Sequence, residues 1–353
     1  MKKLFDFVIG NPPFQESRNK TKDMPVYNYF MDGAESVSSQ SLLITPGRFL
    51  FDAGATPKAW NKKKLHDQHF KILSYNPDSE TVFPSTDIKG GVAITLQNDS
   101  KIYTPIEVFT AFSELDSLRK KVTGIFQFQS LSVIMFSPAS YRFSELVHIK
   151  HPELRYKEKN GKNIGILSKG NDYMLATNIF ENLQNIIFFQ SKPFDGEEYI
   201  QIIGRLKNER KAMWVKRSYI ADHPNLEKWK VILPKSNGSG AIGEVLSTPL
   251  IGEPLIGHNQ TFISIGAFET KAEAEACMKY VKTKFARTML GILKRTQDNP
   301  PEKWKYVPLQ NFTSNSDIDW SKSIAEIDQQ LYRKYRLDEK EIDFIESHVK
   351  EMK

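Results

Sequence analysis

The chain has 353 residues, 40% hydrophobic and 12% aromatic, with a formal net charge of +7. Its length predicts more than one domain, and no stretch approaches the roughly 18 uninterrupted apolar residues of a transmembrane helix, which excludes an integral helical membrane protein. The lone cysteine, Cys277, excludes an internal disulfide and a multi-cysteine zinc site, and no metal site is predicted.

The first part of the chain alternates expected strands with expected helices. Residues 4–9 (LFDFVI) predict a buried strand. Asp6 interrupts this apolar run, which argues against a secretory signal. We therefore expect a cytoplasmic protein without a membrane partner. Further strands are expected over 41–47, 69–76 and 90–98. A helix is expected within DMPVYNYFMDGAES, and a helix, a loop and a second helix within GRFLFDAGATPKAWNKKKLHD. This alternation predicts parallel strands in an α/β sheet.

The second part of the chain shows a different pattern of expected elements. A helical stretch near 105–121 is expected to mark the boundary, after which turns are frequent and the alternation disappears. One long helix is predicted over 271–295, with a core face formed by Met278, Val281, Phe285, Met289 and Leu293. Two amphipathic helices are expected over 324–335 and 338–350. The predicted organisation is therefore two domains, 1–120 and 121–353, the second of mixed α+β structure.

Basic residues concentrate in the segment from Gln201 to Lys235. It holds nine lysines and arginines against three acidic residues, with Trp214, Tyr219 and Trp229 interleaved. This mix is typical of a surface that holds phosphates and approaches bases, although a solvated face with core aromatics is the alternative. The residues we expect to contact DNA are Arg205, Lys207, Arg210, Lys211, Lys216, Arg217 and Lys235.

The tetrapeptide Asn11-Pro12-Pro13-Phe14 follows the first expected strand directly. In an open parallel sheet, ligands bind beyond the carboxyl ends of the strands. Proline fixes φ and has no N–H, so this backbone is stiff and its carbonyls are free to accept hydrogen bonds. With the Asn11 amide oxygen they would hold an aromatic amine, while Phe14 offers a ring for stacking. A structural Asn-Pro turn is the alternative.

The stretch Leu4–Phe14 resembles motif IV, (N/D)PP(Y/F), of amino-group DNA methyltransferases. Its Asn/Phe version is similar to the gamma-like adenine-N6 enzymes of type II restriction–modification systems, and LLITPGRFLFDAG and AWNKKKL resemble the segments after motif IV in those enzymes. VFPSTDIKGGVAI (82–94) resembles their motif VIII region. The resemblance implies that Asn11 and the Pro12 carbonyl accept from the N6 amino group, and that Phe14 and Phe83 stack on a flipped adenine. Gly90-Gly91 would let the backbone turn closely beside this pocket.

The resemblance extends over nearly the whole chain. FISIGAF, KTKFARTMLGILKRTQ, WKYVPLQNF and IDQQLYRKYRLDEKEIDFIES are similar to the TaqI-like specificity domains of the same enzymes. It implies that 1–120 is the C-terminal part of a Rossmann-like catalytic domain (motifs IV–VIII) and 121–353 a target-recognition domain. The implied partner is double-stranded DNA.

The cofactor-binding motif of this family is not found in the chain. S-adenosylmethionine is the expected cofactor, but its glycine loop and acidic residue lie upstream of motif IV in the family, and here ten residues precede Asn11. No cofactor-binding residue is assigned. We expect a partner polypeptide to carry that half, with a truncated gene or a fragment as the alternatives. The isolated chain is then incomplete as an enzyme.

Three alternatives stay open. VILPKSNGSGAIGEVL contains Gly238-x-Gly240-x-x-Gly243, the outline of a cofactor-cradling loop, although a recognition loop is the preferred interpretation. Pro77-Asp78 with Asp87-Ile88-Lys89 imitates a magnesium nuclease signature. The chain as a DNA-binding specificity module without catalysis is the third.

Overall fold

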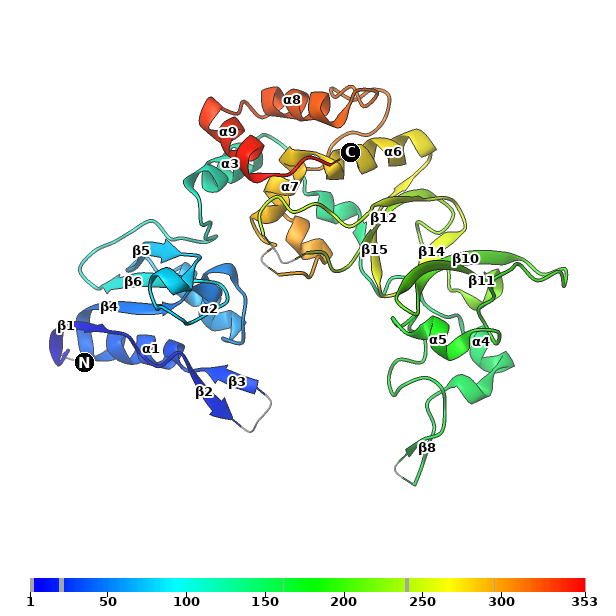
Figure 1. Cartoon of the computed structure of the whole chain (residues 1–353), viewed down its shortest axis with the longest axis horizontal. Coiled ribbons are helices and arrows are strands. Elements are labelled where there is room, and N and C mark those ends of the chain that lie inside the picture. Colours follow the sequence, from blue (N-terminus) through cyan, green and yellow to red (C-terminus); the bar gives the residue numbers. More distant parts are fainter. Residues whose placement is uncertain (1–2, 19–21, 161, 239–240, 295, 353) are drawn as a thin grey trace. The chain divides into compact units, whose positions relative to one another are not determined.

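The computed structural model describes residues 3–18, 22–160, 162–238, 241–294 and 296–352. It divides into two compact units, the first ending at Asp116 and the second beginning at Ser117 (Figure 1). Each unit has its own sheets and helices, so the chain is a mixed α/β protein with several sheets. Among the described residues, no helix combines the length and the apolar character needed to cross a bilayer.

The first unit is built on a four-stranded sheet. Its order is β1 (Phe5–Gly10), β4 (Ser38–Pro46), β6 (Val92–Asn98) and β5 (Phe70–Asn76), at the positions predicted from the apolar runs. β1 and β4 are parallel, but β6 is antiparallel to both β4 and β5. The prediction of a parallel sheet is therefore wrong for β6. Between β5 and β6 there is only the short 3-10 turn η2 (Ser79–Thr81), and a parallel pair needs a longer crossover.

One face of this sheet is covered by helices. α1 (Tyr27–Val37), the 3-10 helix η1 (Gly47–Phe51) and α2 (Lys58–Leu65) occupy the expected helical segments. The core that they form contains Tyr27, Met31, Ala34, Leu43, Phe49, Leu50, Leu65, Phe70 and Ala93. A small hairpin of β2 (Gln15–Arg18) and β3 (Lys22–Pro25), which the sequence did not predict, follows the first strand.

Strand β1 lies at the edge of the sheet and is not buried, contrary to expectation. Phe5, Phe7 and Ile9 are 56%, 48% and 72% exposed, whereas Val8 turns toward the core. Successive side chains of a strand point to opposite faces, so every second residue of this apolar run lies on the uncovered side. The burial prediction failed because it assumed a strand covered on both faces of the sheet.

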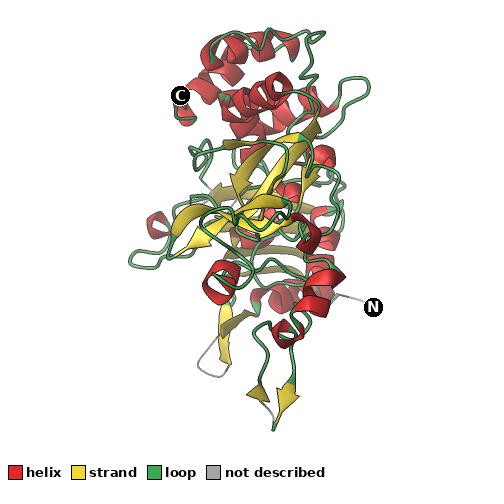
Figure 2. Cartoon of the chain, turned by 90° about the vertical axis from the view of Figure 1, so that its right-hand side faces the viewer, coloured by secondary structure: helices red, strands yellow, loops and turns green. Residues whose placement is uncertain are grey.

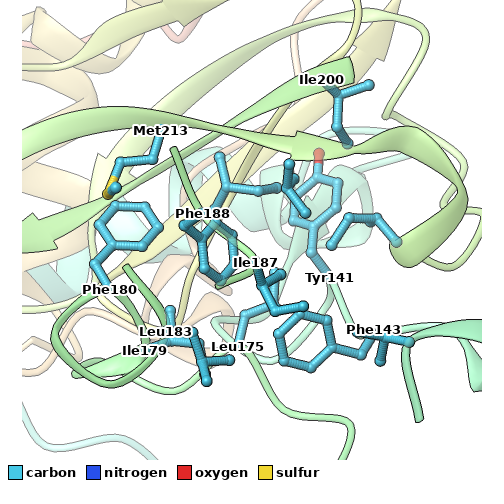
Figure 3. Close-up of a cluster of buried hydrophobic side chains, with 14 of the residues drawn as sticks. Tyr141, Phe143, Leu175, Ile179, Phe180, Leu183, Ile187, Phe188, Ile200 and Met213 are labelled. Atoms are coloured by element: carbon cyan, nitrogen blue, oxygen red, sulfur yellow. The ribbon is translucent and has the colours of Figure 1, made fainter. Parts of the chain in front are cut away.

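The second unit contains two larger sheets. The first has the order β11 (Glu209–Lys216), β10 (Tyr199–Leu206) and β14 (Ile256–His258); the second has the order β13 (Leu250–Gly252), β12 (Trp229–Pro234), β15 (Phe262–Phe268) and β7 (Met135–Phe136). Smaller elements are α4 (Glu145–Lys150), β8 (Glu158–Lys159), β9 (Lys162–Asn163) and α5 (Ile179–Leu183). Figure 3 shows part of the hydrophobic core that β10 and β11 form with α4 and α5, where Phe180 and Phe188 lie with Met213.

The segment predicted as one long helix forms two. α6 (Lys271–Lys282) and α7 (Lys284–Gly291) meet at Thr283, whose ψ of 149° is not helical. The Thr283 hydroxyl donates to the Tyr280 carbonyl at 2.6 Å and accepts from the Ala286 N–H at 3.1 Å. This threonine therefore ends one helix and caps the next. Val281, Phe285 and Met289 are buried as predicted, while Met278 and Leu293 are half-buried.

The remaining helices begin at capping residues. α8 (Ile324–Lys334) and α9 (Glu339–His348) confirm two predicted helices, each starting at a capping box. α3 (Ser113–Thr123) begins later than expected, because Glu107 has a φ of 54°, which no right-handed helix accommodates. α6 to α9 gather near the C-terminus (Figure 1), and helices surround that end of the chain in the side view (Figure 2).

Candidate functional site

The Asn11–Phe14 corner lies at the edge of the sheet where β1 and β4 both end. Because these strands are parallel, the residues after Gly10 and after Pro46 emerge on the same side. β6 runs the opposite way, so the segment that precedes Val92 also lies at this edge. Three loops that are distant in sequence therefore converge where the sequence analysis placed a ligand.

A pocket of about 410 Å³ opens between these loops. Its volume falls within the range of roughly 300–1,000 Å³ that small-molecule sites occupy. The lining residues are Pro13, Phe14, Gln15, Pro25, Tyr27, Pro46, Arg48, Gly54, Ala55, Thr86, Asp87, Ile88 and Lys89. Pro13 and Phe14 of the predicted corner thus line it directly, while Asn11 and Pro12 precede them on the chain.

The Asn11 side chain and the Pro12 carbonyl are available to a ligand. Asn11 is exposed, and its amide makes no hydrogen bond with any residue in the described part of the chain. The Pro12 carbonyl likewise accepts no hydrogen bond there, whereas the Phe14 carbonyl accepts from the Val26 N–H at 3.2 Å. Two acceptors on a stiff backbone thus have no protein partner and can accept hydrogen bonds from a ligand.

Phe14 and Phe83, the two rings expected to stack on a flipped adenine, lie against each other. Their ring centroids are 5.9 Å apart and their planes cross at 75°, an edge-to-face contact. A base stacked between two rings needs them parallel and about 7 Å apart, twice the ~3.5 Å contact between carbon atoms. In this conformation a base therefore contacts Phe14 from the pocket side, and insertion between the rings requires one of them to turn.

Charged groups also line the pocket. The Arg48 guanidinium donates to the Lys89 carbonyl, and Asp87 lies in the same loop. Burial raises the pKa of Tyr27 to about 12, so its hydroxyl stays neutral and can donate. The sequence analysis missed Tyr27 and Arg48, because each looks like an ordinary residue of a helix start.

Gly90 and Gly91 form the tight turn expected beside the pocket. Their φ values are 89° and 70°, a region that residues with a side chain rarely adopt. A Cβ on Gly90 would lie 2.6 Å from the Cγ of Arg48, and one on Gly91 would lie 2.3 Å from the Asn76 carbonyl oxygen. Glycine at both positions therefore lets this loop pack against the pocket wall.

The seven basic residues expected to contact DNA fall into two groups. Three are paired with carboxylates: Lys211 with Glu209 at 2.8 Å, Lys216 with Asp195 at 3.2 Å and Glu197 at 3.3 Å, and Arg217 with Asp222 at 2.5 Å. Lys207 lies at the exposed turn between β10 and β11. The structure brings together Arg205, Arg210 and Lys235, which line one groove.

This groove, which we call the basic groove, has a volume of about 700 Å³. Its other lining residues are Thr177, Asn178, Glu181, Asn208, Pro234, Ser236, Ser247, Thr261 and Phe262. The Arg210 guanidinium lies 5.4 Å from the centre of the Phe262 ring and donates to the Thr248 carbonyl at 3.1 Å. The groove therefore combines three cations with one carboxylate, Glu181.

The glycine-loop alternative lacks the local structure that it requires. Gly240 lies outside the described residues, so the full motif cannot be followed. Gly243 is packed against the backbone of His348 and Val349, and the next element is strand β13. A cofactor-cradling loop leads directly into a helix, whose N-terminus holds the phosphate or ribose.

The nuclease alternative also lacks its expected geometry. Asp78 caps the short turn η2 by accepting from the Glu80 N–H at 3.0 Å, and Asp87 lies in the pocket loop. Neither acid is on a strand, whereas the signature expects two acids on adjacent strands. In the part of the chain that the structure describes, no three histidine, cysteine or acidic side chains gather as a metal site.

One family model matches the N-terminal region of the chain. Residues 1–83 match the family described as Eco57I restriction-modification methylase. This stretch contains the Asn11–Phe14 corner and reaches Phe83, while the basic groove lies outside it. The N-terminal region therefore has the sequence character of a restriction–modification methylase. A search of curated proteins gave no match to the chain.

Two solved structures are similar over most of the chain. One is the type IIG restriction endonuclease BpuSI, at 10% identity and a TM-score of 0.33, covering 90% of this chain and 45% of that one. The other is the type IIL restriction-modification enzyme MmeI in complex with DNA, at 11% identity and a TM-score of 0.37, covering 97% and 56%. These scores are too low to carry an argument. The present chain spans about half the length of both enzymes.

Proposed function

We propose that the chain is the target-base and DNA-recognition part of an adenine-N6 DNA methyltransferase of a restriction–modification system. The observation that carries the proposal is the position of the Asn11–Phe14 corner. Its two acceptors, the Asn11 amide oxygen and the Pro12 carbonyl, have no partner among the described residues and stand beside a pocket. The methylase match over residues 1–83 supports the same interpretation.

The corner suits an exocyclic amine better than other ligand groups. An adenine amino group has two N–H donors, and the corner presents two acceptors with no donor from either proline. Hydrogen bonds in the ring plane leave the nitrogen lone pair above and below the ring, where a methyl donor would approach. The amine of a paired adenine is not reachable in the duplex, so the base must be flipped out.

Phe14 and Phe83 would hold the flipped base by stacking. Their present edge-to-face contact is a resting arrangement that the base would replace. Both rings are only half-buried and stand on loops, so turning one of them disturbs no core packing. The free-energy cost of this opening is small, because one aromatic contact is exchanged for another.

The cofactor is expected to be S-adenosylmethionine, which would supply the methyl group. We assign it no residue in this chain, because the candidate glycine loop does not fit: no helix follows Gly243 before β13. No step is therefore derived through the cofactor. The chain's own residues bind, orient and stack the base.

The exposed face of strand β1 supports the proposal that a partner polypeptide carries the cofactor-binding half. Ile9, Leu42 and Leu96 lie side by side across three strands on the face opposite the helices. Sheets of α/β proteins are normally covered on both faces, and an apolar strand with a free edge pairs readily with another strand. A strand added beside β1, with its helices, would satisfy both requirements.

Calorimetry with S-adenosylmethionine tests whether the partner polypeptide is needed for cofactor binding. We expect no binding to the chain alone and binding to the chain together with the product of the gene immediately upstream. The complete assembly should transfer a labelled methyl group to N6 of adenine in unmethylated genomic DNA. An assembly that binds the cofactor but methylates only cytosine, or nothing, would overturn the proposal.

A specificity module without catalysis is the second candidate. The observation that favours it is the closed contact between Phe14 and Phe83. This module would bind duplex DNA, yet no combination with a cofactor-binding polypeptide would give methyl transfer. The methylation assay therefore separates the two functions, while DNA binding alone does not.

A further inference from the structure

Arg205 and Arg210 occupy opposing positions in the antiparallel pair formed by β10 and β11. Like charges placed directly opposite each other destabilise a strand pair. The turn between them, with Lys207 at a φ of 50° and Asn208 at 66°, fits the two-residue hairpin geometry that fixes the register. The hairpin therefore holds two guanidinium groups together, although their repulsion opposes this arrangement.

No carboxylate relieves this repulsion in the described part of the chain. Arg205 makes no hydrogen bond or ion pair there, and Arg210 donates only to the Thr248 carbonyl. The pKa of Arg210 is lowered by burial and by the nearby charge of Arg205. Glu181, the acid in the groove wall, accepts from the Lys207 backbone N–H at 3.0 Å. A pair of unneutralised arginines is the arrangement expected where an anion binds.

A third cation comes from a different sheet. Lys235 follows β12 directly and lines the same groove, and its ammonium group has no partner among the described residues. The Phe262 ring helps to orient Arg210, whose guanidinium lies 5.4 Å from the ring centre. Cations from two sheets thus face one groove, with one of them already held in place.

We propose that Arg205, Arg210 and Lys235 form a site for phosphate groups of duplex DNA. The inference rests on the proposed DNA-recognition function of the second unit and gives it a location. It also divides the basic segment, because Lys211, Lys216 and Arg217 are already neutralised by carboxylates. Phosphate contacts position a protein on the duplex, and Asn178 and Asn208, which line the same groove, carry amides of the kind that bond to base edges.

Salt-dependent binding of the full chain to a labelled duplex of random sequence tests the site. Each phosphate contact contributes roughly 0.9 to the slope of log affinity against log salt. R205Q, R210Q and K235Q should each weaken binding severalfold and reduce that slope by about one. K271Q, which removes an exposed lysine paired with Glu275 on α6, is the matched control and should change neither quantity.

A charge reversal separates binding from folding. R205E would place a carboxylate opposite Arg210, so its melting temperature should equal or exceed that of the wild type while its DNA affinity falls further than that of R205Q. A variant that melts lower and loses binding only in proportion to its unfolded fraction would overturn the site.

The remaining outcomes distinguish this inference from the proposed function. If the wild-type chain binds no duplex, the DNA-recognition proposal fails together with the site. If the wild-type chain binds the duplex but the three groove variants keep the wild-type salt slope, only the groove assignment fails. The same holds if K216Q lowers the DNA affinity as much as R210Q does. If inorganic phosphate displaces DNA well beyond chloride at equal ionic strength, the groove is a free-phosphate site instead.

Discussion

The ring of Phe83 meets the ring of Phe14 edge to face, with centroids 5.9 Å apart, although 68 residues of chain separate them. Phe14 follows β1, and Phe83 lies in the loop between β5 and β6. The contact exists because both loops leave the sheet at the same edge. It closes the space that a base would enter and leaves the pocket beside Phe14 open.

The first prediction concerns the Phe83 ring. F83A should weaken binding of adenosine to the full chain by about 1–3 kcal/mol, since it removes one stacking face. F83W should retain binding, because it keeps a ring at that position. Phe83 is half-buried, so the unfolding free energy should change little. Titration by NMR measures the affinity, and an F83A variant that binds adenosine as well as the wild type would remove Phe83 from the site.

The second prediction concerns the Asn11 amide. N11A should reduce methyl transfer by the complete assembly on the order of 10²–10³-fold, the scale seen when one hydrogen bond to a reacting centre is lost. Duplex affinity should stay within twofold, because the interaction matters at the reacting amine. N11D keeps an acceptor oxygen and should retain more activity than N11A. Parallel losses of affinity and rate would argue for a structural role.

The third prediction concerns the break between α6 and α7. T283A removes the acceptor that caps α7 and should lower the unfolding free energy by about 1–2 kcal/mol. Thr123 bonds only to Arg119 of its own helix, so T123A should stay within about 0.5 kcal/mol of the wild type. Urea unfolding followed by tryptophan fluorescence measures both. Equal stability of T283A and the wild type would mean that the cap does not hold the break.

The fourth prediction is a pH dependence carried by Asp328. Its carboxylate accepts from the Lys284 and Phe285 N–H groups at 3.0 and 2.9 Å. Burial is the main cause that raises its pKa from 3.8 to about 6; Glu346 acts in the same direction, whereas the two N–H groups and Arg287 oppose it. A pKa raised by folding contributes stability that is full below pH 3.8 and is lost as the pH rises through about 6.

D328N removes this titration. Relative to D328N, the wild type should lose stability between pH 4 and 7, on the order of 2–3 kcal/mol. The asparagine side chain can still accept one of the two N–H bonds, so the variant should fold. Urea unfolding of both proteins across this pH range gives the difference. A constant difference between the two proteins would show that folding does not raise the pKa of Asp328.

The positions of many elements were predictable from local patterns. The apolar runs place β1, β4, β5 and β6, and the capping pairs Ser323–Glu326 and Asp338–Glu341 mark the starts of α8 and α9. Strand direction was not predictable in the same way. Whether β6 runs parallel or antiparallel depends on the connection before it, which carries no periodic signal.

The break at Thr283 escaped prediction because threonine occurs both inside helices and at their caps. The apolar spacing of Val281, Phe285 and Met289 continues across the break, so periodicity alone favours one helix. Only the contact of Thr283 with the turn at Tyr280, and the Asp328 carboxylate at the start of α7, distinguish the two cases.

The candidate site was predictable in part. Asn11–Phe14 is a local motif that follows the first strand, whereas Phe83 was assigned to the same site only by the family resemblance. The division of the basic residues was not visible, because Asp195 and Glu197, which neutralise Lys216, lie outside the basic segment. The opposition of Arg205 and Arg210 depends on the register set by the turn at Lys207 and Asn208.

The most direct test of the central claim is the response of the Asn11 side-chain amide to adenosine. In full-length protein labelled with ¹⁵N-asparagine, this resonance is assigned by its absence from the N11A spectrum. Adenosine should shift it, whereas N6,N6-dimethyladenosine, which has no amino hydrogens to donate, should not. Equal shifts with both nucleosides, or no shift with adenosine at millimolar concentration, would contradict the assignment of this corner to the adenine amine.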